Sequence, residues 1–119
     1  YKLNYINSDK RIISCDSGSK EVDVSKIIYI ESSGHKVTYH IHGKEFGDYV
    51  VKSKLDDIEN ELKEYKYLLR VHQSYIVNMM YVNNISSYRV YLKNGIDLGV
   101  PKSRYKEVKK RILEFKENN

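Results

Sequence analysis

The sequence predicts a mainly β domain in which short, mostly antiparallel strands are accompanied by two helices. Short runs of alternating apolar and polar residues recur along the chain and are separated by Gly, Ser and Asn, as in half-buried strands joined by turns. Two other segments place apolar residues three and four positions apart, which is the period of an amphipathic helix. No internal sequence repeat and no low-complexity segment interrupts this pattern.

About eight strands are expected. They fall at residues 11–15, 21–24, 27–30, 36–42, 45–51, 82–85, 88–92 and 96–100, and the segment 68–78 is also rich in strand-forming residues. Asn94-Gly95 is the strongest hairpin signal, because a two-residue turn favours positive φ at both positions. Gly43-Lys44 is expected to close the hairpin between 36–42 and 45–51, and Pro101 to end the last strand.

The first helix is expected to begin at Ser53, which has the spacing of an N-cap with Asp56 reaching back to it. Its apolar side consists of Leu55, Ile58, Leu62 and Tyr65, and its outer face is acidic at Asp57, Glu61 and Glu64. We expect this helix to cover one side of a sheet. The second helix is expected to be capped by Ser103, with an apolar side formed by Tyr105, Val108, Ile112 and Phe115.

Length and composition indicate one soluble globular domain. A chain of 119 residues can bury roughly two thirds of its unfolded surface, and needs neither a disulfide nor a metal to fold. Its apolar runs are far shorter than the roughly 20 residues of a membrane span. The single Cys15 fits a reducing, cytoplasmic setting, and no secretory leader is visible. The absence of an initiator methionine is expected for a fragment, with residues 1–10 a linker remnant and 11–119 the domain.

Positive charge is concentrated in one half of the chain. Residues 65–113 carry 10 Lys or Arg against 2 Asp or Glu, a net charge of +8, whereas residues 54–64 carry 2 against 5, which is −3. A cationic face of this kind suits a polyanion such as nucleic acid, although Lys-rich surfaces also occur on proteins that bind none.

The sequence gives little support for catalysis or metal binding. His40 and His42 lie on one side of a predicted strand and could form half of a metal site, but no cysteine or clustered carboxylate completes it. His72 and Ser74 lack an acid to orient the histidine and a Gly-rich turn to form an oxyanion hole. Cys15 has no basic neighbour to lower its pKa. We therefore expect no enzyme, no metal and no cofactor.

The segment 68–78 combines two kinds of residue. Leu69, Val71, Tyr75 and Val77 can anchor a backbone in a core, and between them stand the hydrogen-bonding side chains of Arg70, His72, Gln73, Ser74 and Asn78. This mixture predicts a rigid scaffold that presents polar groups to a partner. His35 after a predicted turn and Arg104 at the start of the last helix are donors of the same kind.

Three blocks of the sequence resemble the LytTR DNA-binding domain, the output module of LytR- and AgrA-type response regulators. The block Ile28-Tyr29-Ile30-Glu31-Ser32-Ser33-Gly34-His35-Lys36-Val37 resembles the strand–turn–strand of the family. Leu68-x-Arg70-x-His72-Gln73-Ser74-x-x-Val77-Asn78 resembles its central signature, and Val100-Pro101-Lys102-Ser103-Arg104 the segment before its terminal helix. Together they cover about residues 11 to 113.

The resemblance implies an elongated antiparallel β-sandwich of three sheets, with one short helix between its halves and a C-terminal helix. It also implies double-stranded DNA as the partner, bound through loops without a recognition helix. His35 and Arg104 would contact bases in successive major grooves, and Gln73 would contact the minor groove between them. Candidate phosphate contacts are Lys36, Ser74, Lys102 and Lys106, and the candidate supports of the loop are Arg70, His72 and Asn78.

The expected function is therefore that of a sequence-specific output domain of a bacterial two-component regulator. An N-terminal receiver domain in the full-length protein, direct-repeat promoter sites and a dimer on DNA are expected with it, and membrane association is not. Two alternatives remain open at this point. The acidic helix 54–64 could dock a basic protein, or the tyrosines could serve as stacking platforms for RNA.

Overall fold

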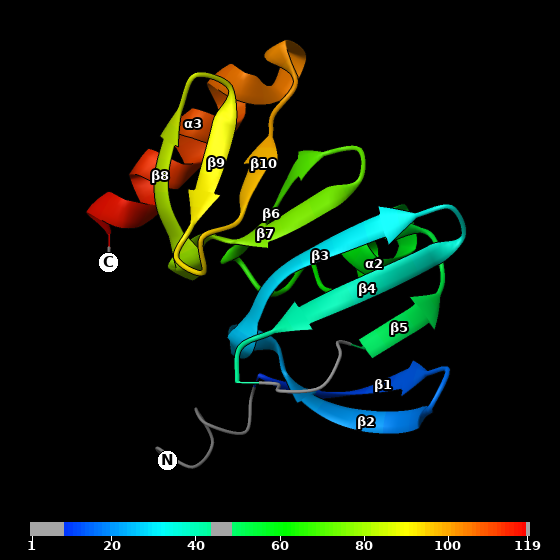
Figure 1. The fold of residues 1–119 in the computed structure, drawn as a ribbon. Coiled ribbons are helices and arrows are strands. Elements are labelled where there is room, and N and C mark those ends of the chain that lie inside the picture. The colour runs from blue at the N-terminus through cyan, green and yellow to red at the C-terminus, as the bar shows by residue number, and fades with distance from the viewer. Residues whose placement is uncertain (1–8, 44–48, 119) are drawn as a thin grey trace.

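The computed structural model describes residues 9–43 and 49–118, in which ten strands form three antiparallel sheets and two α-helices accompany them (Figure 1). The predicted mainly β fold with three sheets and two helices is confirmed. Residues 44–48, with Lys44 of the expected turn and the start of the expected strand 45–51, lie outside the described residues. The expected domain boundary after the linker remnant 1–10 stays a prediction. The structure has β1 beginning at Lys10.

The central sheet has five strands in the order β5-β4-β3-β7-β6. These strands are β3 (Ile27–Ser33), β4 (Lys36–Ile41), β5 (Tyr49–Lys52), β6 (Leu68–His72) and β7 (Tyr75–Asn78). A hairpin of β1 (Lys10–Cys15) and β2 (Gly18–Asp23) forms the second sheet. The third contains β8 (Val82–Ser86), β9 (Arg89–Leu92) and β10 (Asp97–Gly99). The helices are α2 (Leu55–Glu61) and α3 (Lys102–Glu117), and two short 3-10 helices are η1 (Val24–Lys26) and η2 (Met79–Tyr81).

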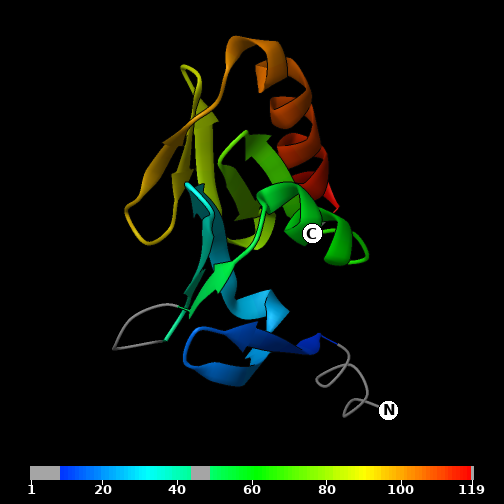
Figure 2. The ribbon, with the colours of Figure 1, turned by 90° about the vertical axis from the view of Figure 1, so that its right-hand side faces the viewer.

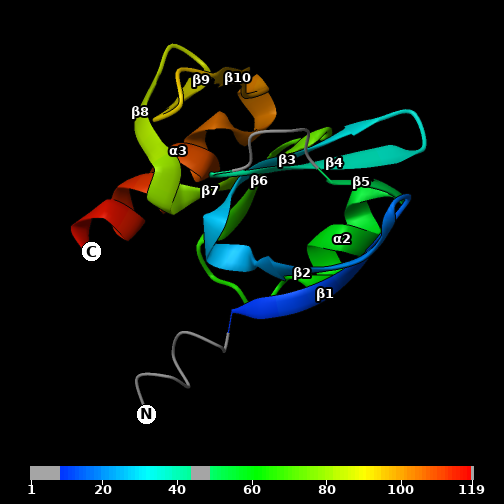
Figure 3. The same cartoon turned by 60° about the horizontal axis from the view of Figure 1, so that its bottom comes forward.

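The part of the central sheet formed by β3, β6 and β7 is covered on both faces, and each face has its own hydrophobic core. One core joins the sheet to the β1–β2 hairpin and α2, and it includes Val22, Ile30, Ile58 and Ile76. Figure 3 shows α2 between that hairpin and the sheet, so the predicted covering role of this helix is correct. The other core joins the sheet to β8, β9, β10 and α3; its members include Val77 from β7 and Ile112 from α3. Adjacent residues of β7 therefore point into different cores, as the period of a strand requires.

An Asx-capped 3-10 helix followed by a strand occurs twice, although no repeat was expected from the sequence. In each copy an Asx side chain caps a 3-10 helix: Asp23 accepts a hydrogen bond from Ser25 N at 3.0 Å, and Asn78 accepts one from Met80 N at 2.9 Å. A strand follows in both places, and its register to the next strand shifts at the equivalent position. The residue types also correspond at the key positions, because Val22-Asp23 and Val77-Asn78 precede the 3-10 helices and Ile27 and Val82 begin the strands that follow. The residues between these positions differ, so the correspondence is short.

Asn78 connects the two copies. Its side chain is fully buried, and its Nδ2 donates to Ser25 O at 3.0 Å and to Ile27 O at 2.8 Å. All three hydrogen bonds of the amide lie at the end of β7 away from the 73–74 turn. Asn78 thus supports the junction of the two halves, and its expected role as a support of the loop is wrong.

Both predicted helix caps are wrong. The residue before α2 is Lys54, which makes no side-chain cap, and the Ser53 hydroxyl instead donates to Lys54 O at 3.3 Å. Pro101 precedes α3 and its carbonyl accepts from Arg104 N and Tyr105 N, so Ser103 lies inside the helix. The apolar positions of the first helix are buried as predicted, but α2 itself ends at Glu61 and Leu62 to Tyr65 follow in a turn.

The tightest turn of the third sheet is not at Asn94-Gly95. Gly95 does adopt a positive φ of 89°, and Asn94 Oδ1 accepts from Ile96 N. Ser87 and Tyr88, however, form the two-residue β8–β9 turn with φ of 51° and 64°. A left-handed backbone at two consecutive residues with side chains is strained, and the pairing of β8 with β9 must offset that cost.

None of the helices described here is long and apolar enough to cross a membrane. Cys15 is half-buried, and desolvation raises the pKa of its thiol. Lys20 lies near enough to act in the opposite direction, so the expectation of no basic neighbour is wrong, but burial has the larger effect.

Replacing Asn78 with alanine should lower the free energy of unfolding by about 3 kcal/mol, because two buried carbonyls and one N–H lose their partner. Chemical denaturation measures this change. Asn84→Ala, at an exposed position of β8, is the matched control and should change stability by no more than about 0.5 kcal/mol. Equal effects of the two substitutions would contradict the assigned role.

Ser87→Gly should raise the free energy of unfolding by about 0.5 kcal/mol, because glycine adopts positive φ without the clash of a Cβ atom. Ser14→Gly, at an exposed position in β1, should instead destabilise by a similar amount. Thermal denaturation of both variants tests the turn geometry; destabilisation by Ser87→Gly would show that the backbone there is not left-handed.

Candidate nucleic-acid interface

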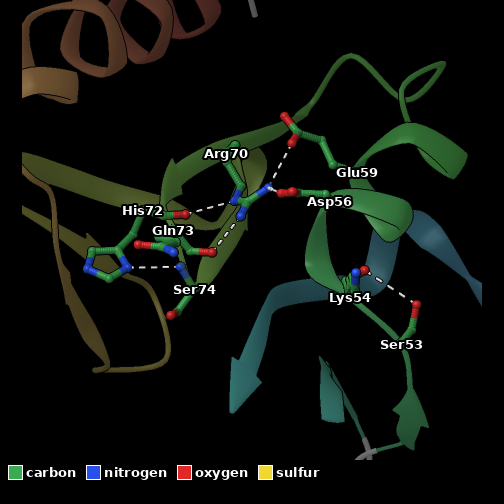
Figure 4. Close-up of polar contacts among 8 residues, drawn as sticks. All are labelled: Ser53, Lys54, Asp56, Glu59, Arg70, His72, Gln73 and Ser74. Carbon is green, nitrogen blue, oxygen red and sulfur yellow. Dashed lines mark hydrogen bonds and ion pairs between the residues drawn. The ribbon is translucent and has the colours of Figure 1, made fainter. Parts of the chain in front are cut away.

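Arg70 organises the β6–β7 turn. Its Nε donates to His72 O at 2.8 Å and its Nη2 to Gln73 O at 2.5 Å, so the guanidinium holds the backbone on both sides of the turn (Figure 4). Its Nη1 lies 2.9 Å from Asp56 Oδ1 and 2.8 Å from Glu59 Oε1, both on α2. The Arg70 side chain is only 10% exposed, but the side chains of Asp56 and Glu59 are 83% and 50% exposed, so solvent screens these ion pairs.

The turn is fixed from its other side by His72 and Ser74. Ser74 N donates to His72 Nδ1 at 2.9 Å, so Nδ1 is the unprotonated nitrogen of that ring. Ser74 O accepts from Ser32 N at 2.9 Å, which ties the turn to the end of β3. The expected supporting roles of Arg70 and His72 agree with this geometry. Gln73 is exposed at the tip.

The β3–β4 turn carries His35 next to this site. Gly34 has a φ of 63°, which lets the chain reverse, and His35 follows it as an exposed residue. His35 O accepts from Ser53 N at 3.1 Å, so the backbone of the turn is anchored to the segment before α2. Gly34 and Gln73 both line one hollow of about 360 Å³, which places the two turns side by side.

Arg104 lies on the first turn of α3 and is exposed. It lines a groove of about 400 Å³ together with Arg70, so Arg70 borders both this groove and the hollow beside Gln73. In Figure 1 the β3–β4 turn, the β6–β7 turn and the start of α3 follow one another along the right-hand and upper edge of the molecule. The fold therefore brings together the three elements that carry His35, Gln73 and Arg104.

The four candidate phosphate contacts lie on the elements that form this edge, but they do not all face the same way. Lys36 begins β4 and is exposed beside His35, and half-buried Ser74 follows Gln73. Lys102 begins α3, with its Nζ 5.9 Å from the centre of the Tyr88 ring. Lys106 lies two residues after Arg104 and faces another side of α3, where it lines a different depression. Arg104 and Lys106 consequently point in different directions.

Two further lysines belong to this surface, although neither was a candidate in the sequence. Lys52 pairs directly with Lys36 across β4 and β5. Like charges opposite each other destabilise a sheet, and a bound anion would remove that cost. Lys54 lines the hollow beside Gln73. Lys36 and Lys52 are neighbours because of the register of β5 against β4, and no local sequence pattern predicts that register.

The acidic helix is partly neutralised by the protein itself, although no cation of the described residues forms an ion pair with Asp57 or Glu61. Arg70 engages Asp56 and Glu59, and Arg11 Nη1 lies 2.9 Å from Glu64 Oε1. This compensation leaves less negative charge for a basic protein than the sequence suggested.

The sequence left open a metal site for the histidines and RNA stacking for the tyrosines, but His40 and most of the tyrosines have structural roles. His40 Nε2 lies 2.7 Å from Glu31 Oε1, and its ring stacks on Tyr29 at 4.1 Å. No group of three or more potential metal ligands occurs within residues 9–43 and 49–118. Tyr29, Tyr39 and Tyr65 are buried, and burial raises the pKa of Tyr39. These rings are core residues and not stacking platforms.

Comparison with known proteins gives three consistent findings. The family model of the LytTr DNA-binding domain matches residues 17–113. The sensory transduction protein LytT of Bacillus subtilis (strain 168) is 33% identical over 97 residues, which cover 76% of this chain and 38% of LytT. The chain thus spans about two fifths of that relative's length.

A solved structure, the LytTr DNA-binding domain of a putative methyl-accepting/DNA response regulator from Bacillus cereus, has the same fold. Its TM-score is 0.69 at 21% sequence identity, and the match covers 88% of this chain and 96% of that one. The match of the family model over most of the sequence, together with this shared fold, decides the assignment: the chain belongs to the LytTR DNA-binding domain family.

Proposed function

We propose that this chain is the sequence-specific, double-stranded-DNA-binding output domain of a bacterial two-component transcriptional regulator, and that it reads bases through loops. The observation that carries the proposal is the arrangement around Arg70. The guanidinium fixes the turn that presents Gln73, and it borders the surfaces that lead to Gly34 on one side and Arg104 on the other. A rigid, exposed row of donors is what base readout requires.

Each proposed base contact has a matching chemistry. The Arg104 guanidinium can bind the O6 and N7 atoms of guanine with two hydrogen bonds, and an N–H of His35 can donate to a purine N7. Gln73 in the minor groove can distinguish A·T from G·C pairs only. Most of the specificity is therefore assigned to His35 and Arg104.

The phosphate contacts are assigned to Lys36, Ser74, Lys102 and Lys106, and we add Lys52 and Lys54. Such contacts fix the register of the protein on the duplex and supply affinity that depends on salt, but they carry no sequence information. Lys36, Lys52 and Lys54 would contact phosphates at one end of this surface and Lys102 at the other, whereas Lys106 would do so from another side of α3.

The proposal extends to the rest of the full-length protein, its DNA sites, its oligomeric state on DNA and its location. The relative LytT is more than twice as long as the matched region, which leaves room for the expected N-terminal receiver domain. Direct-repeat sites, a dimer on DNA and a cytoplasmic location are proposed with it. A loop-borne site needs no two-fold axis between half-sites, so head-to-tail repeats suit it.

Arg104→Ala should cost about 1–3 kcal/mol of binding free energy on a cognate duplex and relax specificity at the contacted base. Electrophoretic mobility titrations on a duplex selected from a random pool, and on its scrambled counterpart, measure both effects. An equal loss on the two duplexes would argue against base readout by Arg104.

Lys106→Ala should weaken binding to cognate and scrambled duplexes about equally and reduce the slope of log K against log salt by about one. The titration is repeated at several salt concentrations. A loss confined to the cognate duplex would contradict a phosphate role for Lys106.

Arg70→Lys should reduce cognate affinity by about tenfold, because one ammonium cannot reproduce the guanidinium contacts to two carbonyls and two carboxylates. The matched control is the double variant Asp56→Asn, Glu59→Gln, which weakens the link to α2 but keeps both hydrogen bonds to the turn. Its cognate affinity should not fall. A similar loss in both variants would assign the effect to the helix link instead of the turn.

A further inference from the structure

The groove between α2 and α3 has a composition that differs from the rest of the surface. It is the same 400 Å³ depression that Arg104 lines, and we call it the α2–α3 groove. Its charged lining residues are Lys63, Lys66, Arg70, Arg104 and Arg111 against Glu59, which is +5 and −1, or +4 net. In Figure 2 α2 lies in front of the later turns of α3, whereas Figure 1 shows the two apart; the residues that line the groove come from α2, the segment after it, β6, β7 and α3.

Four of these cations have no acidic partner within the described part of the chain. Arg70 is neutralised by Asp56 and Glu59. No carboxylate of residues 9–43 or 49–118 forms an ion pair with Lys63, Lys66, Arg104 or Arg111. Four unpaired cations around one depression repel one another, and an anionic ligand would relieve that repulsion.

The floor of the groove is aliphatic. It consists of Leu62, Leu68, Leu69 and Ile76, of which Leu68 and Leu69 are only half-buried. A nucleic-acid backbone has no apolar group to bury on such a floor, whereas a peptide with aliphatic side chains does. The floor thus favours a protein ligand over a nucleic acid.

The groove also contains an edge of the central sheet. β6 is the last strand of that sheet, and Tyr67 O accepts from Met79 N at 2.7 Å, so the peptide group of Tyr67 faces inward. Alternation along the strand then directs the N–H and C=O groups of Leu68 and Arg70 outward. Leu68 N already donates to Tyr65 O at 3.1 Å, so the groups that a peptide could pair with are Leu68 O and the N–H and C=O of Arg70. An extended peptide can pair with an edge of this kind, which gives affinity through the main chain.

We propose that the α2–α3 groove binds a short extended segment of a partner protein that carries both carboxylate and aliphatic side chains. The carboxylates meet Lys63, Lys66 and Arg111, the aliphatic groups cover Leu68 and Leu69, and the main chain pairs with β6. Arg104 belongs to this groove and to the proposed base-reading surface, so the segment competes with DNA. That competition, but not the binding of the segment, rests on the proposed function.

The test uses a fluorescein-labelled hexapeptide of alternating glutamate and leucine, titrated by fluorescence anisotropy. A glutamate–serine hexapeptide of equal charge is the ligand control. We expect the leucine peptide to bind about tenfold more tightly than the serine peptide. Equal binding of the two would overturn the proposal, because the aliphatic floor would then contribute nothing.

Charge reversal locates the site. Lys63→Glu with Lys66→Glu should weaken binding of the leucine peptide by about tenfold or more, whereas Lys109→Glu with Lys110→Glu, which line another depression of α3, should change it by less than about threefold. Equal losses in the two double variants would show general charge attraction and overturn the proposal. Circular dichroism checks that both double variants are folded.

An experiment with duplex DNA distinguishes a failure of this proposal from a failure of the proposed function. A duplex selected from a random pool should displace the peptide from the wild-type chain. Failure of the chain to bind any duplex would refute the proposed function and leave the peptide result standing. If the peptide does not bind and the Lys63, Lys66 double variant loses duplex affinity, the groove is a phosphate site and the peptide proposal is overturned.

Discussion

The arrangement of the candidate interface depends on one guanidinium group. Arg70 binds two carbonyls of the β6–β7 turn and two carboxylates of α2 at the same time. The turn, the helix and the edge strand therefore share a single charged group, whose side chain is only 10% exposed. Only an arginine has enough donors in a fixed plane to make all four contacts. The same group neutralises acids that would otherwise repel a polyanion.

The sheet that carries this contact is held from both faces. Because β3, β6 and β7 contribute side chains to two separate cores, the loops at their ends are attached to a scaffold that cannot tilt without disturbing both. Asn78 joins the two halves at the opposite end of β7 through hydrogen bonds to both 3-10 segments. The ends of β7 thus have separate tasks: one presents the polar turn, and the other fixes the relation of the halves.

The proposed DNA surface and the α2–α3 groove meet at Arg104. Its position on the first turn of α3 lets the side chain reach the groove, whereas Lys102 lies near Tyr88 and Lys106 faces another depression. One helix can in this way contribute to two surfaces of similar charge but different apolar content. Occupation of either surface then affects the availability of the same guanidinium group, which is a direct physical route from partner binding to DNA affinity.

The sequence by itself determined the mainly β class, the buried faces of both helices and the polar composition of the segment around Gln73, because these follow from local periodicity and residue chemistry. It did not determine the helix caps, where Lys54 and Pro101 took the positions expected for serines, nor the left-handed turn at Ser87 and Tyr88. It also misplaced the role of Asn78, whose partners are about 50 residues away. Only the tertiary structure decided which cations stand together. The pairing of Lys36 with Lys52, and the grouping of Lys63 and Lys66 with Arg104 and Arg111, arise from strand register and helix packing between residues distant in the chain.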